Sequence, residues 1–181
     1  MPTSFGQFVK FKAVIATADA PQLGPQRRAG TATEEELAHR LTEFFASERI
    51  SSRLQPLLRS AALLWHDHLD PSHTISQGIE TPEGSWLHGI MHRREPDYGN
   101  AKYWFQRVGR HEAFPKLAER ATDLLSECGD SFFEEGKWDP SAFIDECEAA
   151  GQGNDEEVNA VLCAIQAAEF DVLVEHILSQ A

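Results

Sequence analysis

The sequence predicts an all-α fold: a single-domain helical bundle of about seven helices with an irregular N-terminal arm. Apolar residues recur with the 3.6-residue period of an amphipathic helix along nearly the whole chain. The segments with this period begin at residues that favour helix caps and stop near glycine or proline. A length of 181 residues also suits one well-buried core better than two domains.

The N-terminal segment is where the helical period is weakest. We expect residues 1–32 to form an arm and linker, and residues 33–181 to form the all-α domain. Apolar and polar residues alternate around residues 8–11, as in a short strand, but Val14 and Ile15 break the alternation. One isolated strand cannot form a sheet, so we expect an arm packed on the core. Proline and glycine in residues 16–32 indicate a loop.

Each expected helix has a recognisable start. Thr33 and the three glutamates after it form a capping-box pattern, which opens a first helix that ends near Arg49. A second helix begins after Ser51 and Ser52, and Asp70 with Pro71 is expected to stop it. The remaining helices are expected at residues 81–95, 97–109, 114–128, 139–150 and 154–181, with one short turn at residues 73–78.

Charge and cysteine usage limit the classes of partner. The net charge is −13, and residues 121–181 carry one cation, Lys137, against 15 acidic residues. An acidic region repels a phosphate backbone, so we expect no nucleic-acid binding. Lys10 and Lys12 interrupt the apolar stretch that a signal peptide needs, and no apolar run is long enough for a membrane helix. Three cysteines without a Cys-x-x-Cys pair suggest reduced thiols, and hence a cytoplasmic protein.

Residues 65–111 contain most of the side chains that suit a functional site. Six of the eight histidines and three of the four tryptophans lie in this stretch. Two of the expected helices each carry polar side chains spaced to share one face: His88, His92 and Glu95 on the first, and Asn100, Tyr103 and Arg107 on the second. We predict that these two stripes converge on one pocket.

The contents of this pocket suit a small anionic ligand. Arg107, Arg93 or Arg94 would bind the anion, because a guanidinium presents a planar fork of donors to a carboxylate or phosphate. His68 or His73 is expected to approach the pocket from the preceding segment. Arg107 would be buried in the groove between the helices and paired with a carboxylate when no ligand is bound.

The same stretch also suits a divalent metal ion. Histidines and a carboxylate are common ligands of transition metals, and the candidates here are His66, Asp67, His88 and His92. A third interpretation needs no ligand, since a buried hydrogen-bond network and a tryptophan core would explain many of these residues. The sequence leaves open whether the protein is an enzyme and what its oligomeric state is.

Residues 62–68, AlaLeuLeuTrpHisAspHis, resemble the His-Asp signature of the HD phosphohydrolases. The resemblance implies a metal-dependent phosphohydrolase in which His39 is the upstream ligand and His88 or His92 is an additional histidine. No glycine follows the His-Asp pair, which departs from the pattern of that family. The final aspartate ligand would be one of two residues, Asp97 or Asp123.

Two further resemblances involve the segment after residue 85. Gly89, Ala101 and Phe105 lie where a tetratricopeptide-type hairpin has its small and aromatic packing positions, and this implies an adaptor whose groove holds a partner peptide. The stronger resemblance rests on residues 87–98 (LHGIMHRREPDY) and residues 100–105 (NAKYWF). They are similar to a segment of a family of uncharacterised helical proteins from bacteria and fungi, for which the resemblance implies no activity.

Overall fold

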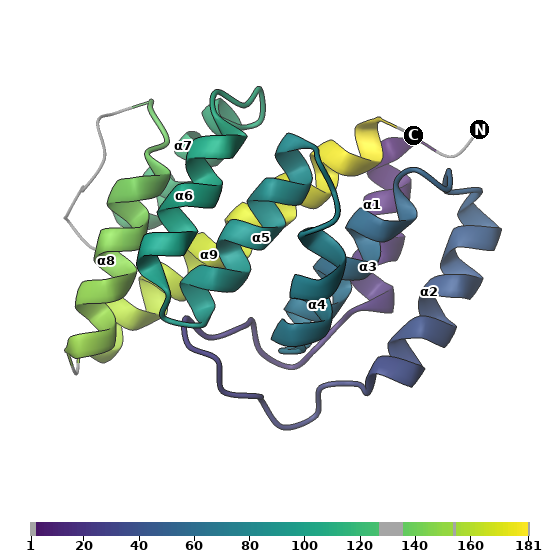
Figure 1. Ribbon diagram of the computed structural model, residues 1–181, viewed down its shortest axis with the longest axis horizontal. Coiled ribbons are helices and arrows are strands. Elements are labelled where there is room, and N and C mark those ends of the chain that lie inside the picture. Colours follow the sequence, from purple (N-terminus) through teal and green to yellow (C-terminus); the bar gives the residue numbers. More distant parts are fainter. Residues whose placement is uncertain (1–2, 127–135, 154, 181) are drawn as a thin grey trace.

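The computed structural model describes residues 3–126, 136–153 and 155–180, and this part of the chain is helical without any strand (Figure 1). Its nine helices are α1 (Ser4–Val14), α2 (Glu34–Glu48), α3 (Gln55–Trp65), α4 (Leu69–Ser76), α5 (Pro82–Arg94), α6 (Tyr98–Val108), α7 (Phe114–Ser126), α8 (Pro140–Gln152) and α9 (Glu156–Ser179). The predicted all-α class is confirmed. The predicted count of about seven helices is wrong, because α1 and α4 were not expected. None of the described helices combines the length and apolar character needed to span a bilayer.

The N-terminal segment is a helix and not an irregular arm or a strand. The Thr3 hydroxyl accepts a hydrogen bond from the backbone N–H of Gly6 and caps α1. Phe11 and Ile15, four residues apart, are both fully buried, and α1 packs against α9 and α2. The alternation around residues 8–11 covers too few positions to separate a strand period from a helical one.

The second expected helix is interrupted by a reversal of the chain after Trp65. Asp67 has a left-handed backbone with a φ of 65°, which no continuous helix permits. A new helix, α4, begins at Leu69, and Pro71 lies in its first turn, where a backbone N–H is not needed. Asp70 and Pro71 therefore open a helix instead of stopping one.

Most of the other helix starts agree with the sequence. The Thr33 capping box is present, and the side chains of Thr81 and Asp139 accept hydrogen bonds from the first turns of α5 and α8. Asp155 caps α9 through the N–H groups of its first turn. The expected end of a helix at Cys128 and the expected cap at Asn154 lie outside the described residues.

Helix α5 is the central element, and it packs against α3, α4 and α6 (Figure 1). Every residue from 83 to 94 is buried. With α6 it forms a tight hairpin, because a Cβ atom at Gly89 would lie 2.8 Å from the ring of Phe105. The hairpin holds the two helices that carry most of the candidate site residues.

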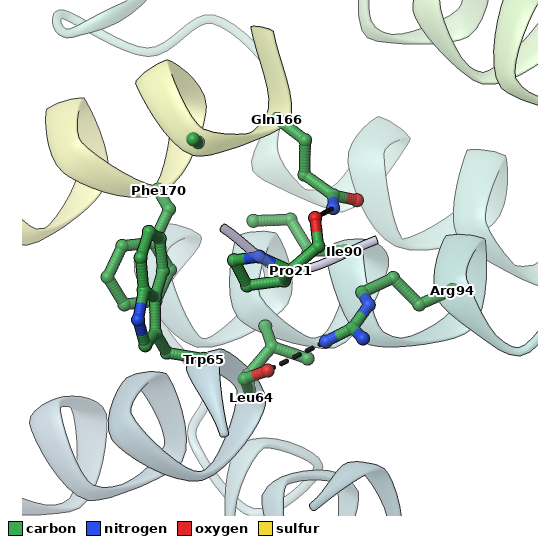
Figure 2. A pocket seen from close by; sticks show the side chains of 8 residues that line it. Pro21, Leu64, Trp65, Ile90, Arg94, Gln166 and Phe170 are labelled. Carbon is green, nitrogen blue, oxygen red and sulfur yellow. Dashed lines mark hydrogen bonds between the residues drawn. The ribbon is translucent and has the colours of Figure 1, made fainter. Parts of the chain in front are cut away.

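The loop between α1 and α2 is attached to the core by side chains of α5 and α9, among others. Pro21 is buried in a small pocket between Trp65 and Ile90, and Gln166 of α9 donates a hydrogen bond to its carbonyl over 3.1 Å (Figure 2). Arg94 of α5 donates to several backbone carbonyls around this loop. These contacts hold the loop between α1 and α2 against α5 and α9.

Candidate metal centre

Three imidazole rings from two helices lie together. The ring centroids of His73 and His88 are 4.6 Å apart, those of His88 and His92 are 4.7 Å apart, and those of His73 and His92 are 5.4 Å apart. One ring nitrogen from each residue lies within 4.8 Å of the other two. The i, i+4 spacing on α5 puts His88 and His92 on one face, and α4 packs against α5 and contributes His73.

These rings are mostly shielded from water. His88 is 2% exposed and His92 is 6% exposed, while His73 is half-buried. Burial, together with the neighbouring His92 and His73, lowers the pKa of His88 to about 4. Burial also lowers the pKa of His92, against the opposing effect of Glu95. Neutral imidazoles carry the lone pair that metal coordination requires.

Ser76 contacts one ring nitrogen of His88. Its Oγ lies 3.0 Å from Nδ1 of His88 and 3.3 Å from the carbonyl of His73. When the single hydroxyl proton is donated to that carbonyl, Oγ accepts from the Nδ1–H of His88, and the lone pair of His88 is on Nε2.

One ring nitrogen of His92 lacks a hydrogen-bond partner among the described residues. Nε2 lies 3.1 Å from the amide of Asn100. Asn100 belongs to the second predicted stripe, and it is the member of that stripe that contacts this cluster. Nδ1 lies 3.3 Å from a carboxylate oxygen of Glu95 without hydrogen-bond geometry, and it is buried with no hydrogen-bond partner among the described residues. Such an atom is costly in a folded protein, because burial removes its water without a replacement.

The rest of the second stripe turns away from the histidines. Trp104 stacks on His88 with ring centroids 4.0 Å apart, and the guanidinium of Arg107 lies on this indole, 5.0 Å from its centroid. Arg107 is exposed, and Tyr103 is 51% exposed. The prediction of a buried Arg107 in the groove is wrong. Helix α6 turns Ala101, Phe105 and Val108 to the core, and Arg107 lies on its outer face.

Arg93 and Arg94 are both 1% exposed, and they lie away from the three histidines. Arg93 donates to Glu169 of α9 over 2.5 Å and to Gln166 over 3.2 Å. Arg94 donates to Asp67 and to the backbone carbonyl of Leu64 near the end of α3. Successive residues of a helix are rotated by about 100°, so the two arginines and His92 face different neighbours.

His66 and Asp67 belong to the contacts that hold the loop between α1 and α2. Nδ1 of His66 accepts a hydrogen bond of 3.0 Å from the backbone N–H of Ala32, and Nε2 lies 3.1 Å from the carbonyl of Ile15. Both ring nitrogens thus have partners, and burial lowers the pKa of His66 to about 4. The structure does not bring His66 together with His88 and His92.

The carboxylate of Asp67 lies between two arginines. It accepts hydrogen bonds of 2.8 Å from Arg28 and 2.7 Å from Arg94. Burial raises its pKa, but these hydrogen bonds outweigh burial and hold the pKa below the usual value. His39, on α2, is largely exposed and pairs with Glu43 over 3.6 Å. The ligand set implied by the HD resemblance is therefore dispersed over the fold.

Of the two candidates for the approaching residue, His73 reaches the cluster. Nε2 of His68 instead lies 2.8 Å from the carbonyl of Ala32. A role for Ser76 was not predicted from the sequence. Its position one helical turn after His73 is the feature of the sequence from which its proximity could have been inferred. That feature was missed because residues 73–78 were expected to form a single turn and not the end of α4.

The chain has no match among protein-family models, and neither the curated proteins nor the solved structures contain a significant match to it. The resemblances found in the sequence therefore stay predictions. The three-histidine cluster depends on its own geometry for any functional interpretation.

Proposed function

We propose that the protein binds a divalent transition metal ion, of the class of Zn²⁺, through His73, His88 and His92. The observation that carries this proposal is the convergence of three imidazole nitrogens within 4.8 Å of one another. Imidazole is a preferred ligand of zinc and its neighbours in the first row. Zn–N bonds of about 2.0–2.1 Å place tetrahedral ligand atoms roughly 3.4 Å apart, which modest rotations of the three rings would reach.

The surroundings of the rings support the same proposal. The Oγ of Ser76 lies 3.0 Å from Nδ1 of His88, which is the kind of outer contact that orients a metal-binding histidine. A flip of the Asn100 amide would let its oxygen accept from the Nε2–H of His92. The unsatisfied Nδ1 of His92 would then carry the lone pair and acquire a partner when the metal binds.

A coordination position is left for a fourth ligand. Glu95 is the nearest carboxylate to His92, and its oxygen lies 3.3 Å from Nδ1. Three histidines with a position open to a carboxylate or a water molecule are typical of zinc sites that react as well as bind.

The same contacts favour a metal ion over a small anion. The three arginines of the sequence hypothesis lie away from the histidine nitrogens, and two of them are engaged with Glu169 and Asp67. Burial keeps His88 neutral at neutral pH, so this ring offers no positive charge to an anion. The remaining attraction for an anion at the cluster is small.

The proposal is tested by titrating Zn²⁺ into the metal-free protein by isothermal titration calorimetry. His88→Gln should lose one equivalent of bound zinc, and Ser76→Ala should weaken binding at that site by about 10–100-fold, as expected for an outer hydrogen bond. His39→Gln is the matched control, because His39 is exposed on α2. Equal stoichiometry and affinity in His88→Gln and the unaltered protein would refute the proposal.

A further inference from the structure

A second group of ligand-type side chains lies at the other end of α5. Glu83 is in the first turn of α5, His111 is in the loop before α7, and His176 is in the last turn of α9. One ligand atom from each residue lies within 4.8 Å of the other two. Oε1 of Glu83 is 3.1 Å from Nε2 of His176 and 3.6 Å from Nε2 of His111.

The ring of His111 is oriented by the backbone. Its Nδ1 accepts a hydrogen bond of 3.2 Å from the N–H of Ala113, so the nitrogen that faces Glu83 is Nε2. The indole of Trp86 meets this ring edge to face, with centroids 4.9 Å apart. With its lone pair on Nδ1, a neutral His111 carries its proton on Nε2 and donates it to Glu83, so a metal ion at Nε2 would have to displace that proton.

His176 also has an outer partner on its far nitrogen. Its Nδ1 lies 3.5 Å from a carboxylate oxygen of Glu112, while Nε2 faces Glu83. A carboxylate behind a histidine is the arrangement that raises the basicity of a metal-binding imidazole. A metal ion bound beside Glu83 would therefore meet Nε2 of His176, with Glu112 behind the ring.

Gln180 and His176 both lie within hydrogen-bond distance of Glu83. The Gln180 amide nitrogen lies 3.0 Å from Oε1 of Glu83 and 2.8 Å from Nε2 of His176. A carboxylate oxygen accepts, so the proton between Oε1 and Nε2 of His176, which are 3.1 Å apart, is donated by the ring. A divalent cation bound between these two atoms would take the place of that proton.

The group is shielded but has an accessible side. The side chains of His111, His176 and Glu83 are 5%, 10% and 11% exposed. His176 also lines an open cavity of about 530 Å³ between α1, α7 and α9. Hydrogen bonds from His111 hold the pKa of Glu83 below its usual range against the effect of burial, so the ligand oxygen is anionic.

We infer that Glu83, His111 and His176 form a second site for a divalent transition metal ion, independent of the three-histidine site. Two imidazoles and one carboxylate supply a mixed nitrogen and oxygen set, as in zinc and non-haem iron sites that keep open positions. The open positions would face the cavity beside His176.

The experiment counts bound Zn²⁺ in variants of the full chain by calorimetry and by metal analysis after dialysis. The unaltered protein should bind two equivalents. His176→Gln and Glu83→Gln should each bind one, and the double variant His88→Gln with His176→Gln should bind none. Glu112→Gln is the matched control, because this carboxylate is exposed and lies behind the ring; it should keep both equivalents and weaken one of them.

This set of variants tests the two proposed sites independently. If His176→Gln and Glu83→Gln bind as many equivalents as the unaltered protein and lose only thermal stability, the group is a hydrogen-bonded clasp and the second site is overturned. If His88→Gln retains every equivalent, only the three-histidine site is overturned. His111→Gln, in the loop before α7, replaces His176→Gln if removing contacts from the end of α9 prevents folding, and it has the same expected result of one equivalent.

Discussion

Replacing Arg94 by methionine removes a buried positive charge while keeping much of the side-chain packing. Arg94 is 1% exposed, and it connects α5 with the end of α3 and with the loop between α1 and α2. Its donors reach four acceptors: the carbonyls of Leu64 at 2.7 Å, Gln22 at 3.0 Å and Gly24 at 3.2 Å, and the carboxylate of Asp67 at 2.7 Å. Figure 2 shows the bond to Leu64 beside the buried Pro21.

The expected loss of stability depends on which hydrogen-bond partners each acceptor keeps after the substitution. Asp67 keeps Arg28, and the carbonyl of Gln22 keeps the amide of Gln166, so these two acceptors are partly compensated. The carbonyl of Leu64 loses a charged donor inside the core, and an unsatisfied buried acceptor costs about 1–3 kcal/mol. Removing one partner of a buried ion pair costs about 3–5 kcal/mol in total. We therefore expect Arg94→Met to lower the free energy of unfolding by about 3–5 kcal/mol.

The assay is urea denaturation followed by the helical circular-dichroism signal. Arg107→Met is the matched control, because it is the same substitution at an exposed arginine that contacts the Trp104 ring, and its effect should stay within about 1 kcal/mol. A loss of less than about 1 kcal/mol in Arg94→Met would refute the reasoning. The desolvation of the Arg94–Asp67 pair would then offset nearly everything that the pair contributes.

Two more predictions concern packing and pH. Gly89→Ala should lower stability by about 1–3 kcal/mol in the same assay, because the new methyl group would meet the ring of Phe105, while Gly99→Ala, with open space around it in the described part of the chain, should be neutral or stabilising. His66 is neutral in the fold, since burial lowers its pKa from 6.5 to about 4. Its contribution is fully present above pH 6.5 and should decline by up to about 3 kcal/mol towards pH 4, because only the unfolded state gains the proton there. A His66→Gln variant should show a correspondingly shallower decline, and an unchanged slope would contradict the assignment.

The helix boundaries that could be predicted are those set by local chemistry. Thr33, Thr81 and Asp139 cap helices with their own side chains, so a few adjacent residues contain the signal. The α1 helix could not be recognised in this way, because its burial depends on α9, which is more than 140 residues away in the chain. The left-handed turn at Asp67 is likewise held by Arg28 and Arg94, which are remote in sequence.

The parts of the candidate site that could be predicted depend on one helix or on one hairpin. The i, i+4 spacing of His88 and His92 on α5 and the proximity of Asn100 follow from the hairpin of α5 and α6. His73 and not His68 reaches the cluster because the chain reverses at Asp67 and α4 begins at Leu69. The types of residues 66–68 do not predict this reversal. The group around Glu83 joins three elements, so no spacing in the sequence marks it.

The burial of α5 on all sides is the reason why the sequence pattern places the arginines and the histidines in one pocket. A helix with every residue from 83 to 94 buried has no solvent face, so its polar residues cannot be separated from its core residues by periodicity. Steps of about 100° per residue then direct His92 to Asn100, Arg93 to Glu169 and Arg94 to Asp67. Each polar side chain meets a different partner element, and each network is separable by mutation. Arg94→Met should therefore change stability without removing a bound metal ion, and His88→Gln should remove a metal ion while the contacts of Arg94 persist.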